Sequence, residues 1–93
     1  MKTLKKVEII PVYVEFIPDY IKQDMLYISK VYNTAVHLCL CGCGYLSVTP
    51  LNKEGWSLTE SDNKVSLSPS ILNTNCPKQS HYVITNNIVN ILN

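Results

Sequence analysis

Three of the four cysteines lie on alternate positions of one short segment, HLCLCGCGYL, at residues 37–46. In an extended chain Cys39, Cys41 and Cys43 would share one face. Thiolates are strong ligands for zinc, which takes four ligands in a tetrahedron at distances of about 2.0–2.3 Å. Same-face neighbours on a flat strand are about 6.6–7 Å apart, too far to share one ion. The two glycines in the run let the backbone curl so that the thiols converge, which predicts half of a metal site.

The other half of the site must come from a distant segment. Cys76 is the remaining cysteine, and His81 follows it with a C-x4-H spacing that can close on one metal. His37 shares a strand face with the first cysteines, but a core position or a hydrogen bond to a ligand suits it better. Structural zinc is predicted, held by four of five residues. These are Cys39, Cys41, Cys43, Cys76 and His81.

Other uses of the same cysteines stay open at this point. An iron–sulfur cluster or redox-active thiols, a catalytic zinc, a cysteine nucleophile and buried free cysteines without metal are all compatible with the spacing. The paired C-x2-C motifs of ordinary zinc ribbons do not occur in the chain.

The composition is that of a small globular protein, with 46% hydrophobic and 16% charged residues among 93. We expect a single domain spanning residues 1–93. All eight basic residues are lysines and they are scattered, which argues against nucleic acid as a partner. No secretory signal and no membrane span are expected, so the predicted location is the cytoplasm. In that compartment clustered cysteines indicate metal rather than disulfides.

Alternation with a period of two dominates the sequence and predicts the elements that position these residues. A hairpin over 81–92 is expected to turn at Asn86-Asn87, since asparagine tolerates positive φ. The segment 57–64 is expected to be a loop, and only the N-terminal residues and 20–24 could be helical. Further strands are predicted at 12–17, 25–29, 35–41, 45–51 and 65–68.

The strand at 35–41 is predicted to turn Val36, Leu38 and Leu40 toward the core, with His37 and the first cysteines on the opposite face. Pro11 should begin a strand or lie on an edge strand, since it lacks an amide donor. The predicted fold is mainly β: a small, zinc-stapled antiparallel β domain with little or no helix.

The order of short motifs resembles a known family. It runs EFIP, LYIS, TAVHLCLCGCG, VTPL, Trp56, VSLSPSI followed by Asn73, and SHYVI. This is similar to the small bacterial and phage family catalogued as domain of unknown function 6527, over about Val14 to Asn90. The H-x-C-x-C-G-C-G run with the downstream P-S-I and S-H-Y-x-I blocks is the specific part.

The resemblance implies a compact, β-rich metal-binding domain, with some relatives encoded beside bacterial ubiquitin-like conjugation genes. It places the metal ligands on Cys39, Cys41, Cys43 and His81. The chain departs from the family where Lys78 replaces a cysteine before Ser-His, so either Cys76 supplies that thiolate or the other four ligands suffice. Leu72 also replaces the family's glycine before Asn73.

Three functions are compatible with these residues. The first is an accessory module that binds a protein partner, such as components of a ubiquitin-like conjugation system. It is favoured by the small size of the chain, by the absence of an evident acid–base pair and by the genes found beside some relatives. The second is a zinc-dependent hydrolase, and the third is a thiol enzyme with Cys41 or Cys43 beside His37 or His81. The hydroxyls of Ser68, Ser70 and Ser80 could contact a substrate, although turn capping or a hydrogen bond to a cysteine suits them better.

Overall fold

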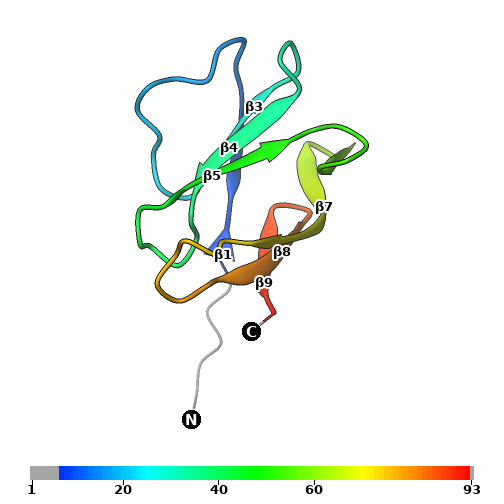
Figure 1. The fold of residues 1–93 in the computed structure, drawn as a ribbon. Helices are drawn as coiled ribbons and strands as arrows, with labels where there is room; N and C mark the ends of the chain where they lie inside the picture. The colour runs from blue at the N-terminus through cyan, green and yellow to red at the C-terminus, as the bar shows by residue number, and fades with distance from the viewer. Residues whose placement is uncertain (1–6, 93) are drawn as a thin grey trace.

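The structure, a computed structural model, describes residues 7–92 and contains two β-sheets that share one hydrophobic core (Figure 1). The five-stranded sheet has the order β1-β9-β8-β7-β6, and the four-stranded sheet has the order β2-β3-β4-β5. Residues 7–92 form no helix, which confirms the mainly β prediction and means that none of them lies in a membrane-spanning helix. The strands are β1 Val7–Glu8, β2 Ile10–Tyr13, β3 Met25–Ser29, β4 Thr34–Leu38, β5 Leu46–Pro50, β6 Ser57–Ser61, β7 Lys64–Leu72, β8 His81–Thr85 and β9 Ile88–Ile91.

Two tight hairpins build most of the five-stranded sheet. The predicted β8–β9 hairpin is confirmed, with Asn86 and Asn87 at φ 49° and 69°. The same geometry joins β6 to β7, where Asp62 and Asn63 have φ 52° and 65°. The prediction of a loop at 57–64 is therefore wrong. Strand β6 lies at the sheet edge with four of its five residues exposed, so it lacks the apolar alternation that identifies a strand.

The four-stranded sheet departs from an antiparallel arrangement at one edge. Strand β2 pairs in parallel with β3, because the long connection between them returns the chain to the starting end. The strand predicted at 12–17 instead ends at Tyr13, and Pro11 lies on this edge strand as expected. Residues 20–24 form no helix, and the helix considered for the N-terminal residues lies largely outside the described residues.

The predicted core face of β4 is only partly right. Val36 and Leu40 are buried as predicted, but Leu38 is only half-buried, whereas His37 is 0% exposed and points between the sheets. His37 takes this inward place because its ring nitrogen finds the hydroxyl of Tyr82, a strand β8 residue, across the core. A buried polar side chain with a partner can thus occupy a face that an apolar pattern alone would not select.

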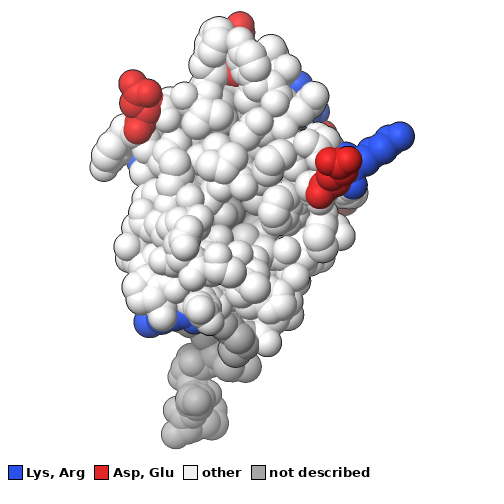
Figure 2. Space-filling model, in the orientation of Figure 1, with Lys and Arg blue, Asp and Glu red and all other residues white. Residues whose placement is uncertain are grey.

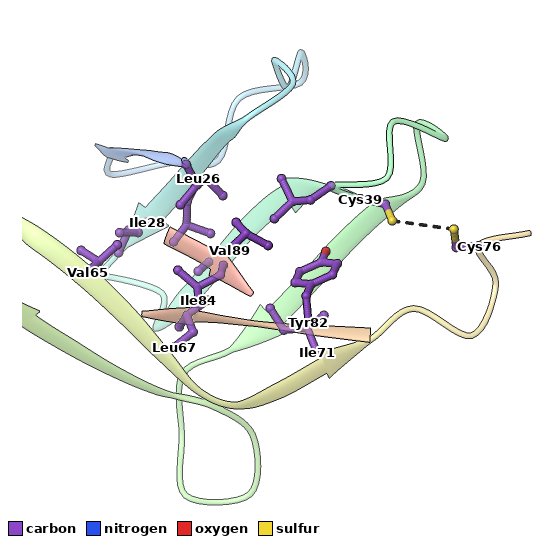
Figure 3. Packing of buried hydrophobic residues seen from close by; sticks show 13 residues of the cluster. Leu26, Ile28, Cys39, Val65, Leu67, Ile71, Cys76, Tyr82, Ile84 and Val89 are labelled. Carbon is purple, nitrogen blue, oxygen red and sulfur yellow. Dashed lines mark hydrogen bonds between the residues drawn. The ribbon is translucent and has the colours of Figure 1, made fainter. Parts of the chain in front are cut away.

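The core combines aliphatic side chains with two cysteines at one end (Figure 3). Tyr82, Ile84 and Ile71 from the five-stranded sheet face Leu26 and Ile28 from the four-stranded sheet. Cys39 and Cys76 close this core at the end where the β4–β5 and β7–β8 loops meet. The two sheets are therefore joined by apolar packing along their length and by sulfur atoms at one end.

The β8–β9 turn supports a stability prediction. The Asn87 side-chain oxygen accepts a hydrogen bond from the Val65 backbone amide at 2.8 Å, and the backbone amide of Asn87 donates to the Val65 carbonyl. Asn87→Ala should lower the free energy of unfolding by about 2–3 kcal/mol, since a buried amide loses its partner and alanine disfavours positive φ. Asn86→Ala, which changes only the φ preference, should cost about 1 kcal/mol. Equal losses for the two variants in urea unfolding would contradict this account.

Candidate functional site

Four cysteines from two distant segments converge at the end of the core. The Sγ atoms of Cys39, Cys41, Cys43 and Cys76 all lie within 4.8 Å of one another. The Cys76 sulfur lies 3.7, 3.2 and 3.3 Å from those of Cys39, Cys41 and Cys43, respectively. All four are free thiols rather than disulfides. Sequence reasoning thus placed the four cysteines correctly in one cluster.

Local turns bring these sulfurs together. The Cys39 amide donates to the Tyr45 carbonyl at 2.7 Å, which closes the β4–β5 loop into a compact curl. Gly42 and Gly44 have φ 89° and 86°, a backbone conformation that other residues avoid. On the other side, the Cys76 amide donates to the Asn73 carbonyl at 3.1 Å in a turn that points its side chain inward. The curl predicted from the two glycines is therefore present.

The donor set fits a metal ion that prefers sulfur. Thiolates at about 2.3 Å from a tetrahedral ion would lie about 3.8 Å apart, close to the separations seen here. Burial raises the pKa of Cys76, but hydrogen bonds from Cys41 and from the backbone of Lys78 and Ser80 outweigh it and lower the pKa to about 5. A hydrogen bond from the Tyr45 backbone lowers the pKa of Cys43, but desolvation and the neighbouring cysteine sulfurs outweigh it and raise the pKa to about 12. Without a cation the crowded thiols cannot all ionise, and a bound metal would remove that conflict.

His81 does not join the cysteine cluster. The group of side chains that could hold a metal contains the four cysteines without this histidine. The His81 Nε2 atom instead lies 2.7 Å from the Ser70 hydroxyl. Because Lys78 replaces a cysteine of the family, the fourth group could be either the Cys76 thiol or the His81 imidazole. The structure places Cys76 in the cluster and His81 outside it.

Ser70 and His81 face one another on the outer side of the five-stranded sheet. Ile71 and Tyr82 are paired, buried neighbours on β7 and β8, so the residue before each of them points outward. Strand β7 shifts register between Leu67 and Ile71, where Pro69 cannot donate a ladder hydrogen bond. Beyond this irregularity Leu72 is the direct partner of His81, and Ser70, two residues earlier on the same face, lies diagonally across from the histidine.

A buried polar network lies between the cysteine cluster and the serine–histidine pair. The Tyr82 hydroxyl lies 2.7 Å from His37 Nε2 and accepts a hydrogen bond from Asn73 Nδ2 at 3.0 Å. The Asn73 side-chain oxygen in turn accepts from the Ser47 hydroxyl at 3.0 Å. Burial lowers the pKa of His37 to about 4, so its ring is neutral. The Nδ1 atom of His37 has no hydrogen-bond partner within residues 7–92. In this part of the chain the Tyr82 hydroxyl is therefore the one hydrogen-bond partner of the His37 side chain.

The pairing of Ser70 with His81 was not predicted from the sequence. The sequence favours turn capping or a hydrogen bond to a cysteine for the serine, and a role beside the metal or a cysteine nucleophile for the histidine. The signal available was the joint presence of the P-S-I and S-H-Y blocks, but their spacing matches no general hydrolase motif. Only the strand register shows that the two side chains share a face.

Together, fold and site define a small all-β protein that carries a four-cysteine cluster and a separate serine–histidine pair. The chain belongs to the family described as bacterial ubiquitination-like system serine protease (BubE), whose family model matches residues 13–92. The comparison confirms a bacterial family linked to a ubiquitin-like system, under this description rather than as domain of unknown function 6527. Neither the curated proteins nor the solved structures gave a significant match.

The polar network gives a direct test of its contribution to stability. Tyr82→Phe would leave His37 and the Asn73 amide group without their shared partner in the core. The expected loss in free energy of unfolding is about 1–3 kcal/mol, measured in guanidinium. Tyr20→Phe removes the hydroxyl of a side chain that is 76% exposed and should have almost no effect. A Tyr82→Phe protein as stable as the Tyr20→Phe protein would contradict the role given to this hydroxyl.

Proposed function

We propose that this protein is a serine protease of a bacterial ubiquitin-like conjugation system, with Ser70 as nucleophile and His81 as general base. The observation that carries the proposal is the 2.7 Å contact between the Ser70 hydroxyl and His81 Nε2. A serine is a weak nucleophile until a neighbouring base accepts its proton, and this separation lies within the range for such a pair. The family to which the chain belongs is described by the same activity.

The geometry supports the usual two-step acyl transfer. The Ser70 oxygen attacks the carbonyl carbon of the scissile bond while His81 Nε2 takes the hydroxyl proton. The imidazolium then gives this proton to the leaving amine, and an ester joins Ser70 to the acyl part of the substrate. A water molecule, deprotonated by His81, hydrolyses the ester and restores the serine.

The two other enzymatic hypotheses have less support. In a thiol enzyme, a histidine would have to activate Cys41 or Cys43, but the Nε2 atoms of His37 and His81 both contact hydroxyl groups. A catalytic zinc needs an open coordination position, which four convergent cysteines do not leave. The hypothesis of a non-enzymatic accessory module rests in part on the lack of a visible acid–base pair in the sequence. The Ser70–His81 contact removes that reason.

We further propose that the cysteine cluster holds zinc, with Cys39, Cys41, Cys43 and Cys76 as its ligands and His81 reserved for catalysis. Zinc would serve structure here by pinning the β4–β5 loop to the β7–β8 loop. The Ser80 hydroxyl lies 3.6 Å from the Cys76 sulfur and directly precedes His81, so the cluster fixes the start of the strand that carries the base. The reduced cytoplasm would keep these thiols available for metal.

The partner implied by this proposal is a protein substrate that carries or resembles ubiquitin. The face of the molecule in Figure 2 has few charged side chains, and those are near its periphery. Such a surface offers no basic stripe for phosphates and suits a mainly uncharged polypeptide.

The catalytic assignment predicts the effect of removing either member of the pair. Ser70→Ala and His81→Ala should each reduce kcat for cleavage of a ubiquitin-like precursor protein by at least about 10³-fold. Ser68→Ala, which removes an exposed hydroxyl on the same strand, should stay within about twofold of the parent rate. Cleavage can be followed by mass spectrometry of the products. Full activity in Ser70→Ala would exclude this serine as nucleophile.

The metal assignment predicts a different pattern for the same histidine. Cys43 is exposed, so Cys43→Ser sacrifices little packing, yet it should lose zinc and melt at a lower temperature. His81→Ala should retain about one zinc per chain, since a four-thiolate site needs no histidine. Elemental analysis of purified proteins measures both. Loss of zinc from His81→Ala with retention in Cys43→Ser would overturn the ligand set.

A further inference from the structure

Strand β7 has an unpaired edge directly beside the Ser70 hydroxyl. Strand β6 pairs with β7 only as far as Ser57 opposite Ser68. Before Ser57 the chain turns away, and the Trp56 amide donates to the Pro50 carbonyl at 2.9 Å instead of continuing the ladder. Residues 70–72 therefore pair with β8 on one side, while no other strand among residues 7–92 pairs with them on the other.

The backbone groups along this edge are directed outward. The Asn73 amide donates to the Ser80 carbonyl at 2.9 Å, so Asn73 and Ser80 form a hydrogen-bonded pair. Antiparallel ladders alternate, so the next pair, Leu72 with His81, is not hydrogen-bonded. The amide and carbonyl of Leu72 thus point away from β8, toward the open edge. On the other side of β8, the His81 carbonyl accepts a hydrogen bond from the Leu92 amide. The backbone groups of His81 therefore point away from β7, and those of Leu72 point away from β8.

Apolar side chains flank the pair on the same face. Leu72 is the cross-strand partner of His81 and is 54% exposed, and Leu92, which directly follows β9 and donates its amide to the His81 carbonyl, is 51% exposed. Exposed leucines on both sides of a reactive serine and histidine favour contact with apolar substrate side chains.

We propose that the substrate binds as an extended peptide that adds a strand to the Ser70–Leu72 edge of β7, in line with β6. The inference rests on the proposed protease function and specifies its substrate: an unfolded segment with an apolar side chain near the scissile bond. Adjacent strands lie about 4.8 Å apart, so the added backbone passes within reach of the Ser70 oxygen. Main-chain hydrogen bonds to Leu72 hold the segment, and the exposed Leu72 side chain contacts an apolar side chain of the peptide.

Two measurements on the metal-loaded full chain test this proposal and separate it from the protease function. A fluorophosphonate probe should label Ser70 in the parent protein and fail to label Ser70→Ala. A fluorogenic hexapeptide, selected by cleavage from a random library, is then resynthesised with one backbone amide methylated at a time. Strand addition requires every second peptide amide, so kcat/KM should fall about tenfold at alternate positions and little between them. Uniform effects, an effect at one position alone, or labelling without cleavage of any peptide would overturn strand addition while leaving the reactive serine intact.

A variant at the edge provides an independent readout. Leu72→Pro removes the outward amide without removing a bond to β8, and should lower kcat/KM for the peptide about tenfold more than it lowers the fluorophosphonate labelling rate. Leu72→Ala keeps the backbone amide and should lower kcat/KM less than the proline variant does. Equal decreases in kcat/KM for the two variants would contradict a hydrogen bond from the Leu72 amide to the substrate. Absence of labelling in the parent protein would instead overturn the protease function, and this inference with it.

Discussion

The convergence of four cysteine sulfurs is the constraint on which the rest of this small structure depends. It joins the β4–β5 loop of one sheet to the β7–β8 loop of the other, at the end where the shared core closes. Elsewhere the sheets are joined by apolar packing and by exposed contacts such as those of Glu60 with Tyr13 and Lys30, and exposed ion pairs contribute little to stability. A chain of 93 residues buries a modest core, so a cross-link between sheets has a large effect.

Strand β8 connects this constraint to the chemistry through the alternation of its side chains. Ser80 and Tyr82 point inward, where one contacts the Cys76 sulfur and the other joins His37 and Asn73. His81 lies between them and points outward to Ser70. A change in the cysteine cluster or the polar network therefore shifts the backbone on both sides of the histidine. In a site built on rigid strands, a displacement of about 1 Å is enough to weaken catalysis.

The spacing and composition of the sequence predicted the cysteine cluster and the turns. The contacts that depend on how the strands align with one another were not predicted. Cysteines near two glycines indicated the cluster, and Asn86-Asn87 indicated a turn, because those residue types carry their own local geometry. The partner of His81 could not be predicted, since it depends on which residues of β7 and β8 lie beside each other across the sheet. The inward position of His37 was missed for a similar reason: the ring contacts a tyrosine from the other sheet.

The separation of the cysteine cluster from the serine–histidine pair has a consequence for how the proposed protease would select its substrates. The serine–histidine pair lies on the outer face of a sheet, beside exposed leucines. Such a site provides few side-chain contacts for selecting a substrate. Under the proposed strand addition, recognition would come mainly from the peptide backbone, with the exposed leucine beside the edge adding a preference for an apolar side chain. The unstructured tail of a folded protein can add a strand in this way, whereas the folded part of the same protein cannot. The proposed selectivity for substrates would therefore depend on exposure of the backbone as much as on sequence.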